Sequence, residues 1–219
     1  MKRFTFFLGL IAALGFGSLS VVAQAGGGAG GNGHALGLNK LLCFSGTDDG
    51  GIYGGTCTIT RRGAQGAALL DTDDGDPDGS YAGVYTNDRS IYGRPLSSIG
   101  TLSFRFSGDP ASAGSPRFSV PIDTDADGDT DIWAFISAFY CNDGSGNVSP
   151  RNAGCTIFTS DGGSYAGVSA LTAAYPGAKI ANDNYVFVIS DEPGTWTVSH
   201  VKFGNPSNGH HNDGPSKGE

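Results

Sequence analysis

Short apolar runs separated by turn-forming residues are the feature that most constrains the fold of this chain. The runs are rich in β-branched and aromatic residues, which favour strands, and Gly, Pro and Asp lie between them. In the run TLSFRF, Leu102, Phe104 and Phe106 alternate with Ser103 and Arg105, as in a strand that buries one face. Many short strands joined by such turns are typical of a β-sandwich or a β-barrel, so we predict an all-β, antiparallel fold.

Two segments fit this pattern less well. Residues 131–141, DIWAFISAFYC, have apolar residues at helical spacing, but they also alternate as a strand buried on both faces does. The lack of charges after Asp131 and the final cysteine favour a strand. Residues 167–177, GVSALTAAYPG, are alanine-rich and end at Pro176-Gly177, so we predict one short helix there.

The four cysteines form two pairs with the same spacing, Cys43 with Cys57 and Cys141 with Cys155. An even number of cysteines in a secreted chain indicates disulfide bonds, and four cysteines allow three connectivities. The equal spacing favours the two local bridges, each closing a hairpin or loop rich in Gly, Asp and Asn. The Cys-x-x-Cys spacing of a zinc site is absent.

The first 25 residues have the composition of a secretory signal peptide. Lys2 and Arg3 form a basic start, an apolar run follows, and Ala23-Gln24-Ala25 is a small-residue cleavage site. We expect cleavage near Ala25 and secretion into the extracellular space or the periplasm.

The rest of the chain divides into three parts by composition. Residues 26–38 are a Gly-rich flexible linker, and residues 205–219 are a polar tail that we expect to be disordered. Residues 39–204 are long enough for one domain with its own core. We therefore predict a single β-sandwich domain at 39–204.

The chain is acidic, with a net charge of −8 that becomes −10 without Lys2 and Arg3. Nucleic acids and anionic membrane surfaces bind basic footprints, which such a chain lacks. After the signal peptide, no apolar run reaches the roughly 18 residues that a membrane helix needs. We expect neither a nucleic-acid partner nor membrane insertion.

An aspartate occupies every second position of DTDADGDTD, residues 123–131. On a strand these carboxylates would share one face and repel one another. In a loop with Gly128 at relative position 6, the spacing fits a calcium site, in which carboxylates replace the water around a hard cation. A solvated acidic loop without an ion is the alternative. We predict calcium as a cofactor, with the metal ligands Asp123, Asp125, Asp127, Asp131 and Asp129, the last through its carbonyl oxygen.

This stretch resembles the calcium loops of EF-hands, dockerins and thrombospondin type 3 repeats. The resemblance covers residues 123–131 and implies a loop that surrounds one calcium ion. It fails at relative position 12, where an EF-hand has a bidentate Glu and this chain has Ala134. This difference puts a helix–loop–helix in doubt and favours a single structural site inside a β protein.

A second acidic cluster, DTDDGDPDG at 71–79, is one residue out of phase with the calcium pattern. An exposed acidic turn and a second metal site are equally compatible with it. The candidate ligands of that second site are Asp71, Asp73, Asp76 and Asp78, with Asp74 beside them.

The residues available for acid–base catalysis are few. The only glutamates are Glu192 and Glu219, and His200 is the sole histidine in the predicted domain. No Gly-x-Ser-x-Gly or paired-histidine zinc motif occurs. His200 with Asp191 is the remaining catalytic pair, and a histidine without a catalytic role is the alternative interpretation. The sequence therefore favours binding over catalysis.

The closing run GTWTVSHVKFG resembles the last strand of extracellular jelly-roll modules, including carbohydrate-binding ones, and 39–204 is similar in style to such domains. No individual family is identified. The resemblance implies a jelly-roll sandwich, and Trp133 and Trp196 are candidate sugar-stacking residues unless they belong to the core.

We therefore expect a secreted, calcium-binding module that binds an extracellular polysaccharide or surface glycan, in an adhesion or matrix role, without catalysis. The alternatives are a small secreted glycan hydrolase or lyase and a structural surface or fibre subunit.

Overall fold

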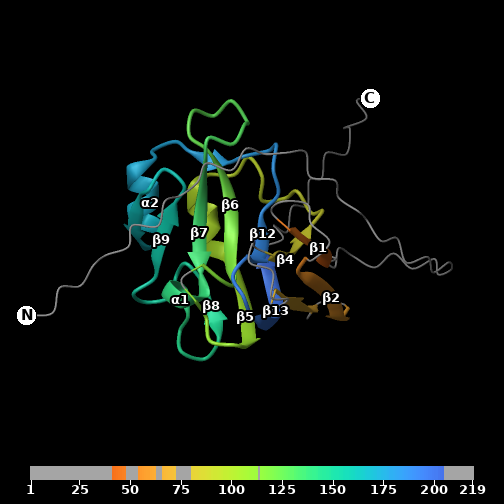
Figure 1. Cartoon of the computed structure of the whole chain (residues 1–219). Coiled ribbons are helices and arrows are strands. Elements are labelled where there is room, and N and C mark those ends of the chain that lie inside the picture. Colours follow the sequence, from red (N-terminus) through yellow and green to blue (C-terminus); the bar gives the residue numbers. More distant parts are fainter. Residues whose placement is uncertain (1–40, 48–53, 63–65, 73–79, 113, 205–219) are drawn as a thin grey trace, which may run out of the picture.

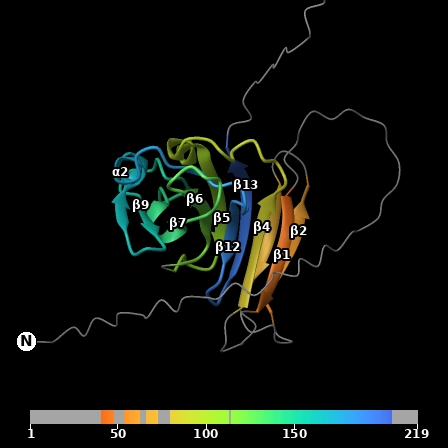
Figure 2. The same cartoon turned by 90° about the horizontal axis from the view of Figure 1, so that it is seen from above.

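The computed structural model describes residues 41–47, 54–62, 66–72, 80–112 and 114–204, which form two antiparallel sheets packed face to face (Figures 1 and 2). In spatial order, the eight-stranded sheet consists of β1 (Leu41–Thr47), β4 (Ser80–Thr86), β12 (Phe187–Ser190), β6 (Arg117–Asp123), β7 (Ile132–Ser137), β9 (Thr156–Thr159) and β10 (Ser164–Ala166), with β11 (Lys179–Ile180) paired to β6. The five-stranded sheet consists of β2 (Thr56–Arg61), β3 (Ala67–Asp71), β13 (Thr195–Phe203), β5 (Leu102–Gly108) and β8 (Asn147–Val148). The predicted antiparallel β-sandwich is confirmed.

The strand connections are those of a jelly roll. Eight strands form the roll, and in chain order they are β3, β4, β5, β6, β7, β8, β12 and β13. The first pairs with the eighth, the second with the seventh, the third with the sixth and the fourth with the fifth. This is a long hairpin rolled into two sheets, as in jelly-roll domains. β1 and β2 extend one end of the sandwich, and β9 and β10 extend the other (Figure 1).

The core lies between the inner faces of the two sheets. The predicted alternation in β5 is confirmed, since Leu102 and Phe104 are fully buried and Arg105 is exposed. The Phe104 ring packs edge to face against Phe118 of β6 at 5.2 Å, and Phe118 packs against Phe203 of β13 at 5.9 Å. These three rings join strands of both sheets and bury large apolar areas, which stabilises the sandwich.

The helices are short. The predicted helix is confirmed as α2 (Gly167–Ala174), which lies beside β9 at one end of the sandwich (Figure 2). The strand predicted over 131–141 is correct for β7 but too long, because the chain turns into α1 (Ala138–Cys141). A 3-10 helix, η1 (Leu96–Thr101), also precedes β5. Among the described residues, no helix has the length and apolar character needed to cross a membrane.

Both predicted disulfides are confirmed, Cys43–Cys57 and Cys141–Cys155. Neither closes a β-hairpin, because β1 pairs with β4 and β2 pairs with β3. The first bridge instead joins the edge strands of the two sheets. The second joins the end of α1 to the residue before β9. Two disulfides are typical of a protein from an oxidising extracellular or periplasmic environment.

Several predictions concern residues outside the described part of the chain. These are the signal peptide at 1–25, the linker at 26–38, the tail at 205–219, and the acidic residues Asp73, Asp74, Asp76 and Asp78.

Candidate functional site

The aspartate-rich loop connects β6 to β7 and projects beyond the ends of these strands (Figure 1). Asp123 is the last residue of β6, and Asp131 directly precedes β7. The Asp131 N–H donates to the Ile122 carbonyl at 2.9 Å, which closes the base of the loop. On the other side, the Asn182 N–H donates to the Gly128 carbonyl at 2.9 Å. The loop is thereby held at both its base and its tip.

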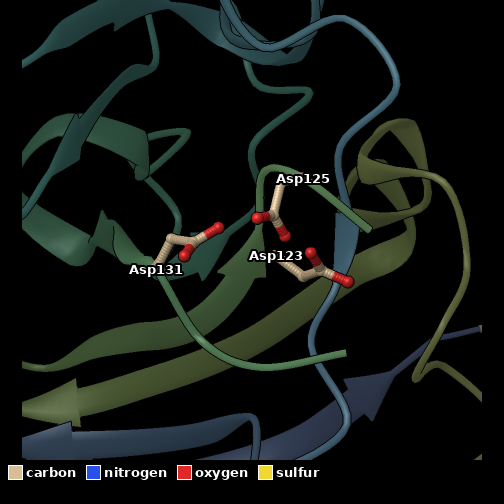
Figure 3. A group of neighbouring side chains, drawn as sticks. All are labelled: Asp123, Asp125 and Asp131. Carbon is tan, nitrogen blue, oxygen red and sulfur yellow. The ribbon is translucent and has the colours of Figure 1, made fainter. Parts of the chain in front are cut away.

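Three of the five predicted metal ligands come together in this loop. One carboxylate oxygen from each of Asp123, Asp125 and Asp131 lies within 4.8 Å of the other two. Figure 3 shows the three carboxylates gathered around one region, with Asp125 and Asp131 directed toward each other. The carboxylates of Asp127 and Asp129 are not part of this group. The predicted ligand atom of Asp129 is its carbonyl oxygen, and that ligand stays a prediction. The Asp127 carboxylate instead accepts a hydrogen bond from the Asp129 N–H at 2.9 Å.

Asp123 is the residue that shapes the loop. Its side chain is only 2 % exposed, and its two oxygens accept hydrogen bonds from the N–H groups of Ala126 at 2.6 Å and Gly128 at 2.9 Å. Ala126 and Gly128 have positive φ angles of 69° and 104°, so the chain turns sharply around this carboxylate. Glycine adopts that conformation without steric cost, which explains the residue at 128. Each carboxylate oxygen has a second lone pair, so both remain able to bind a cation.

Asp131 is held from the opposite side. Its Oδ2 accepts hydrogen bonds from the Thr124 hydroxyl at 2.5 Å and the Thr124 N–H at 2.7 Å. The side-chain hydrogen bond from Thr124, together with the backbone one, lowers the pKa of Asp131 below its usual value. The carboxylate is therefore ionised at neutral pH.

This arrangement is chemically suited to a hard divalent cation. Closely spaced carboxylates repel one another, and a cation between them removes that repulsion. Calcium takes six to eight oxygen ligands in flexible geometry, which carboxylates, backbone carbonyls and water supply together. The triad could thus hold a metal ion through Asp123, Asp125 and Asp131.

The loop contacts a second polar segment, residues 182–184, which was not predicted from the sequence as part of a site. The Thr130 hydroxyl donates to the Asp183 carboxylate at 2.5 Å, and the Asn184 amide donates to the Thr130 hydroxyl at 3.0 Å. Burial raises the pKa of Asp183, but the hydrogen bonds from Thr130 more than offset this, and the pKa is lowered overall. The sequence Asn-Asp-Asn at 182–184 is a turn signal that could have indicated this segment.

Of the four candidate ligands in the second acidic cluster, the structure describes Asp71. Asp71 is the last residue of β3, and its carboxylate accepts a hydrogen bond from the Thr195 hydroxyl at 3.2 Å. This contact ties β3 to β13. The prediction of a second metal site stays a prediction.

The outer face of the eight-stranded sheet carries many aromatic side chains. On each strand, alternate residues pack into the core, and the residues between them point outward. The outward residues on β4, for example, are Tyr81, Gly83 and Tyr85, whereas Ala82 and Val84 are fully buried. We call the outward aromatic side chains that keep part of their surface accessible the outer aromatic face: Phe44, Tyr81, Tyr85, Trp133, Phe135, Phe158 and Phe187.

Four of these rings lie on one line across the strands. Tyr85 of β4 is directly opposite Phe187 of β12, and Phe187 is opposite Ser119 of β6. Ser119 is opposite Phe135 of β7, which is in turn opposite Phe158 of β9. Directly opposite side chains are the closest neighbours in an antiparallel sheet, so this line forms a continuous row.

Two further rings join the row from the sides. Phe187 lies 5.4 Å from Phe44 of β1 and 5.5 Å from Trp133 of β7, measured between ring centroids. In each case one strand lies between the two that carry the rings, so the rings lean over the intervening strand. Ser119 on β6 is only 3 % exposed for this reason.

A glycine makes room for the Phe44 ring. A Cβ atom at Gly83 would lie 2.4 Å from Phe44 Cζ, closer than side chains tolerate. The ring therefore covers Gly83 and presents its other side outward. The pairing of Phe44 with Gly83 in the register of β1 and β4 brings this contact about.

Trp196 does not belong to this face, and its prediction as a sugar-stacking residue is wrong. It lies on β13 in the other sheet, is 1 % exposed, and donates its indole N–H to the Asp109 carbonyl at 3.0 Å. A ring without accessible surface cannot stack on a ligand. Trp133, the other candidate, is half-buried on the outer aromatic face.

Arg117 is the charged residue within this face. It forms an ion pair with Asp191, and its guanidinium lies 5.3 Å from the centroid of the Phe135 ring. The Ser115 hydroxyl also donates to Asp191 at 2.9 Å. Asp191 is thus engaged by Arg117 and Ser115, whereas the His200 ring contacts the Ser199 hydroxyl at 3.2 Å. The structure does not bring together the candidate catalytic pair of His200 and Asp191.

A pocket of about 490 Å³ lies beside the second disulfide, between η1 and the start of α2. Arg151 is the charged residue among its described lining residues, which otherwise include Ser97, Asn152, Thr156 and Ser169. None of these described lining residues is a carboxylate or a histidine, so they offer no general acid–base pair.

Comparison with protein-family models, with curated protein sequences and with solved structures finds no match to this chain.

Proposed function

We propose that this chain is a secreted β-sandwich module that binds an extracellular polysaccharide or surface glycan without cleaving it. The observation that carries the proposal is the outer aromatic face. Sugar rings have apolar C–H faces that pack on aromatic side chains, while neighbouring polar groups bind the hydroxyls. The partly accessible rings on one sheet supply the aromatic part, and the ion pair of Arg117 with Asp191, which lies beside Phe135, supplies polar groups.

We further propose that calcium binds the triad of Asp123, Asp125 and Asp131 in a structural role. The triad follows β6 and precedes β7, and Trp133 lies two residues after Asp131. An ion that fixes the ends of these strands would stabilise the part of the sheet that carries Trp133. Calcium removal is then expected to lower stability and to weaken glycan binding together.

The test is a glycan array, combined with insoluble polysaccharides on which new reducing ends are measured. Retention without new reducing ends supports a binding module. New reducing ends, or unsaturated products absorbing in the ultraviolet, would indicate a hydrolase or lyase. No retention on any glycan overturns the proposal and favours a structural surface subunit.

Point variants connect binding to the face. A sugar that covers about 50 Å² of a ring gains roughly 1.2 kcal/mol, so Trp133→Ala and Phe187→Ala should each weaken binding about eight-fold. Lys202→Ala is the control, since Lys202 is exposed on β13 of the other sheet. Equal affinities for all these variants, with unchanged melting temperatures, would place binding elsewhere.

A further inference from the structure

We infer that the ligand of the outer aromatic face is a single, linear, uncharged polysaccharide chain that lies across the strands and is bound in mid-chain. This inference rests on the proposed function and specifies its substrate class: β-1,4-linked pyranoses with equatorial substituents. Three observations carry it, namely the direction of the aromatic row, the charge of the face and the tilt of the rings.

The direction of the row sets the direction and length of the ligand. Tyr85, Phe187, Phe135 and Phe158 lie on β4, β12, β7 and β9, with β6 in the middle, so the row runs perpendicular to the strands. At about 4.8 Å per strand, the four spacings from β4 to β9 span ~19 Å. One pyranose unit has nearly the length of one strand spacing, so the row accommodates about four or five consecutive sugars.

The face favours an uncharged chain. The outward positions of β1, β4, β12, β6, β7 and β9 hold aromatic and aliphatic residues, Gly, Pro, Ser and Thr, and two charged residues at the two ends of β6, Arg117 and Asp123. Asp123 is only 2 % exposed, and its carboxylate accepts the N–H groups of its own loop. Asp191 neutralises Arg117 through their ion pair. The whole chain carries a net charge of −8, which opposes the approach of an anionic polymer. A neutral glycan on the aromatic row would lie beside Arg117, whose charge is paired with Asp191, and would not be repelled by the net negative charge of the chain.

The rings beside the row are tilted relative to Phe187. The planes of Phe44 and Phe187 meet at 80°, and those of Trp133 and Phe187 meet at 52°. A flat crystalline polysaccharide surface would need coplanar rings, whereas a single chain can twist from one ring to the next. β-1,4-linked pyranoses with equatorial substituents present apolar C–H faces along such a chain, and these faces can pack on Phe187 in the row and on Phe44 and Trp133 beside it, whose ring centroids lie 5.4 and 5.5 Å from that of Phe187.

The experiment is calorimetric titration with two series of oligosaccharides, β-1,4-linked glucose and β-1,4-linked N-acetylglucosamine, each of one to seven units. In at least one series, affinity should rise with every added unit up to about four or five units and then level off. Crystalline polysaccharide of the same composition should retain less protein than the amorphous form.

Variants at the two ends of the row provide the matched test. Tyr85→Ala and Phe158→Ala each remove a ring at one end of the row, and each should lower hexamer affinity about eight-fold while leaving dimer affinity unchanged. Lys202→Ala on the other sheet should change neither affinity.

The outcomes separate this inference from the proposed function. Affinity that is already maximal with one or two units overturns mid-chain binding and leaves the module intact. Binding to array glycans but to neither series, or only to anionic polymers, overturns the substrate class alone. A chain that binds no glycan and instead forms dimers that dissociate in Phe187→Ala overturns both.

Discussion

Replacing the aspartates of the β6–β7 loop one at a time should separate its folding role from its metal role. Asp123 accepts backbone hydrogen bonds from Ala126 and Gly128 and is buried, so it stabilises the loop without any ion. Asp131 is exposed, and its carboxylate accepts a hydrogen bond from the Thr124 N–H. Both belong to the triad, so both should be needed for calcium binding.

The magnitudes follow from these contacts. Each hydrogen bond to a charged acceptor contributes about 1.5 kcal/mol, so Asp123→Ala should lower the free energy of unfolding by ~3 kcal/mol in EDTA. For a chain of this length that corresponds to a fall in melting temperature of about 6–12 °C. Millimolar calcium at a Kd of about 0.1 mM should raise the stability of the wild type by about 1.4 kcal/mol, or roughly 3–6 °C.

The assay is thermal unfolding in EDTA and in 1 to 5 mM calcium or magnesium, with all concentrations as approximate working values. Asp131→Ala should lose less stability in EDTA than Asp123→Ala, because the hydrogen bonds from Thr124 to Asp131 are exposed to solvent, and it should gain nothing from calcium. Asp129→Ala is the matched control, because it removes one negative charge from the same loop but lies outside the triad. A full calcium response in Asp131→Ala, or its loss in Asp129→Ala, would refute the assignment of the ion to the triad.

The other predictions concern packing, the disulfides and pH. Gly83→Ala places a Cβ atom 2.4 Å from Phe44 Cζ and 2.5 Å from the Val188 carbonyl oxygen, so it should destabilise the chain by about 1–3 kcal/mol in chemical denaturation and weaken glycan binding. An unchanged midpoint would show that Phe44 does not lie over Gly83. Replacing Cys43 and Cys57 together by Ser should cost about 3 kcal/mol, since the bridge closes a loop of 14 residues, and the change should be visible as a lower melting temperature under non-reducing conditions. A loss no larger than that of a single exposed Ser-to-Ala change would argue against the inter-sheet bridge. Hydrogen bonds, first from the Ser145 side chain and then from its N–H, lower the pKa of Asp143 to about 2. A lowered folded-state pKa gives stability that is complete above the unfolded value near 4 and is lost as pH falls toward 2, so the difference in melting temperature between wild type and Asp143→Ala should shrink between those pH values. A difference that stays constant from pH 5 to pH 2 would contradict this.

Local sequence patterns predicted the elements whose structure depends on local chemistry. The alternation of TLSFRF identified β5, and Pro176-Gly177 marked the end of the helical segment at α2. The equal spacing of the cysteines identified both bridges but left open whether Cys43–Cys57 closes a hairpin or a loop. That bridge joins two sheets, and the partner of each strand is decided by contacts distant in sequence.

The aspartate loop shows which features a spacing pattern can predict and which it cannot. The pattern identified the loop and Gly128, because a sharp turn around a carboxylate needs a residue that tolerates positive φ. It did not tell which carboxylates converge. The Asp127 carboxylate accepts the Asp129 N–H instead, and the loop around it is held by the hydrogen bond from the Asn182 N–H to the Gly128 carbonyl, a contact distant in sequence.

The two tryptophans show what alternation leaves undecided. A strand in a sandwich has one face toward the core and one toward solvent, and period two separates the faces without saying which is which. Both Trp133 and Trp196 lie among apolar residues, yet one is half-accessible and the other is 1 % exposed. The distinction arises from the sheet partner, since Trp133 lies opposite Pro121 on the outer side and Trp196 lies opposite Leu70, which is fully buried.

Because alternation does not tell which face of a strand points outward, the sequence alone did not predict the aromatic row. Tyr85, Phe187, Phe135 and Phe158 are far apart in the sequence, and they form one line only through the registers of β4, β12, β6, β7 and β9. A shift of one residue in any of these pairings would turn a ring from the outer face toward the core. The row therefore depends on the rolled topology as a whole. Gly83 is a local sequence signal for this face, because a glycine inside a strand leaves space for a large ring from the neighbouring strand.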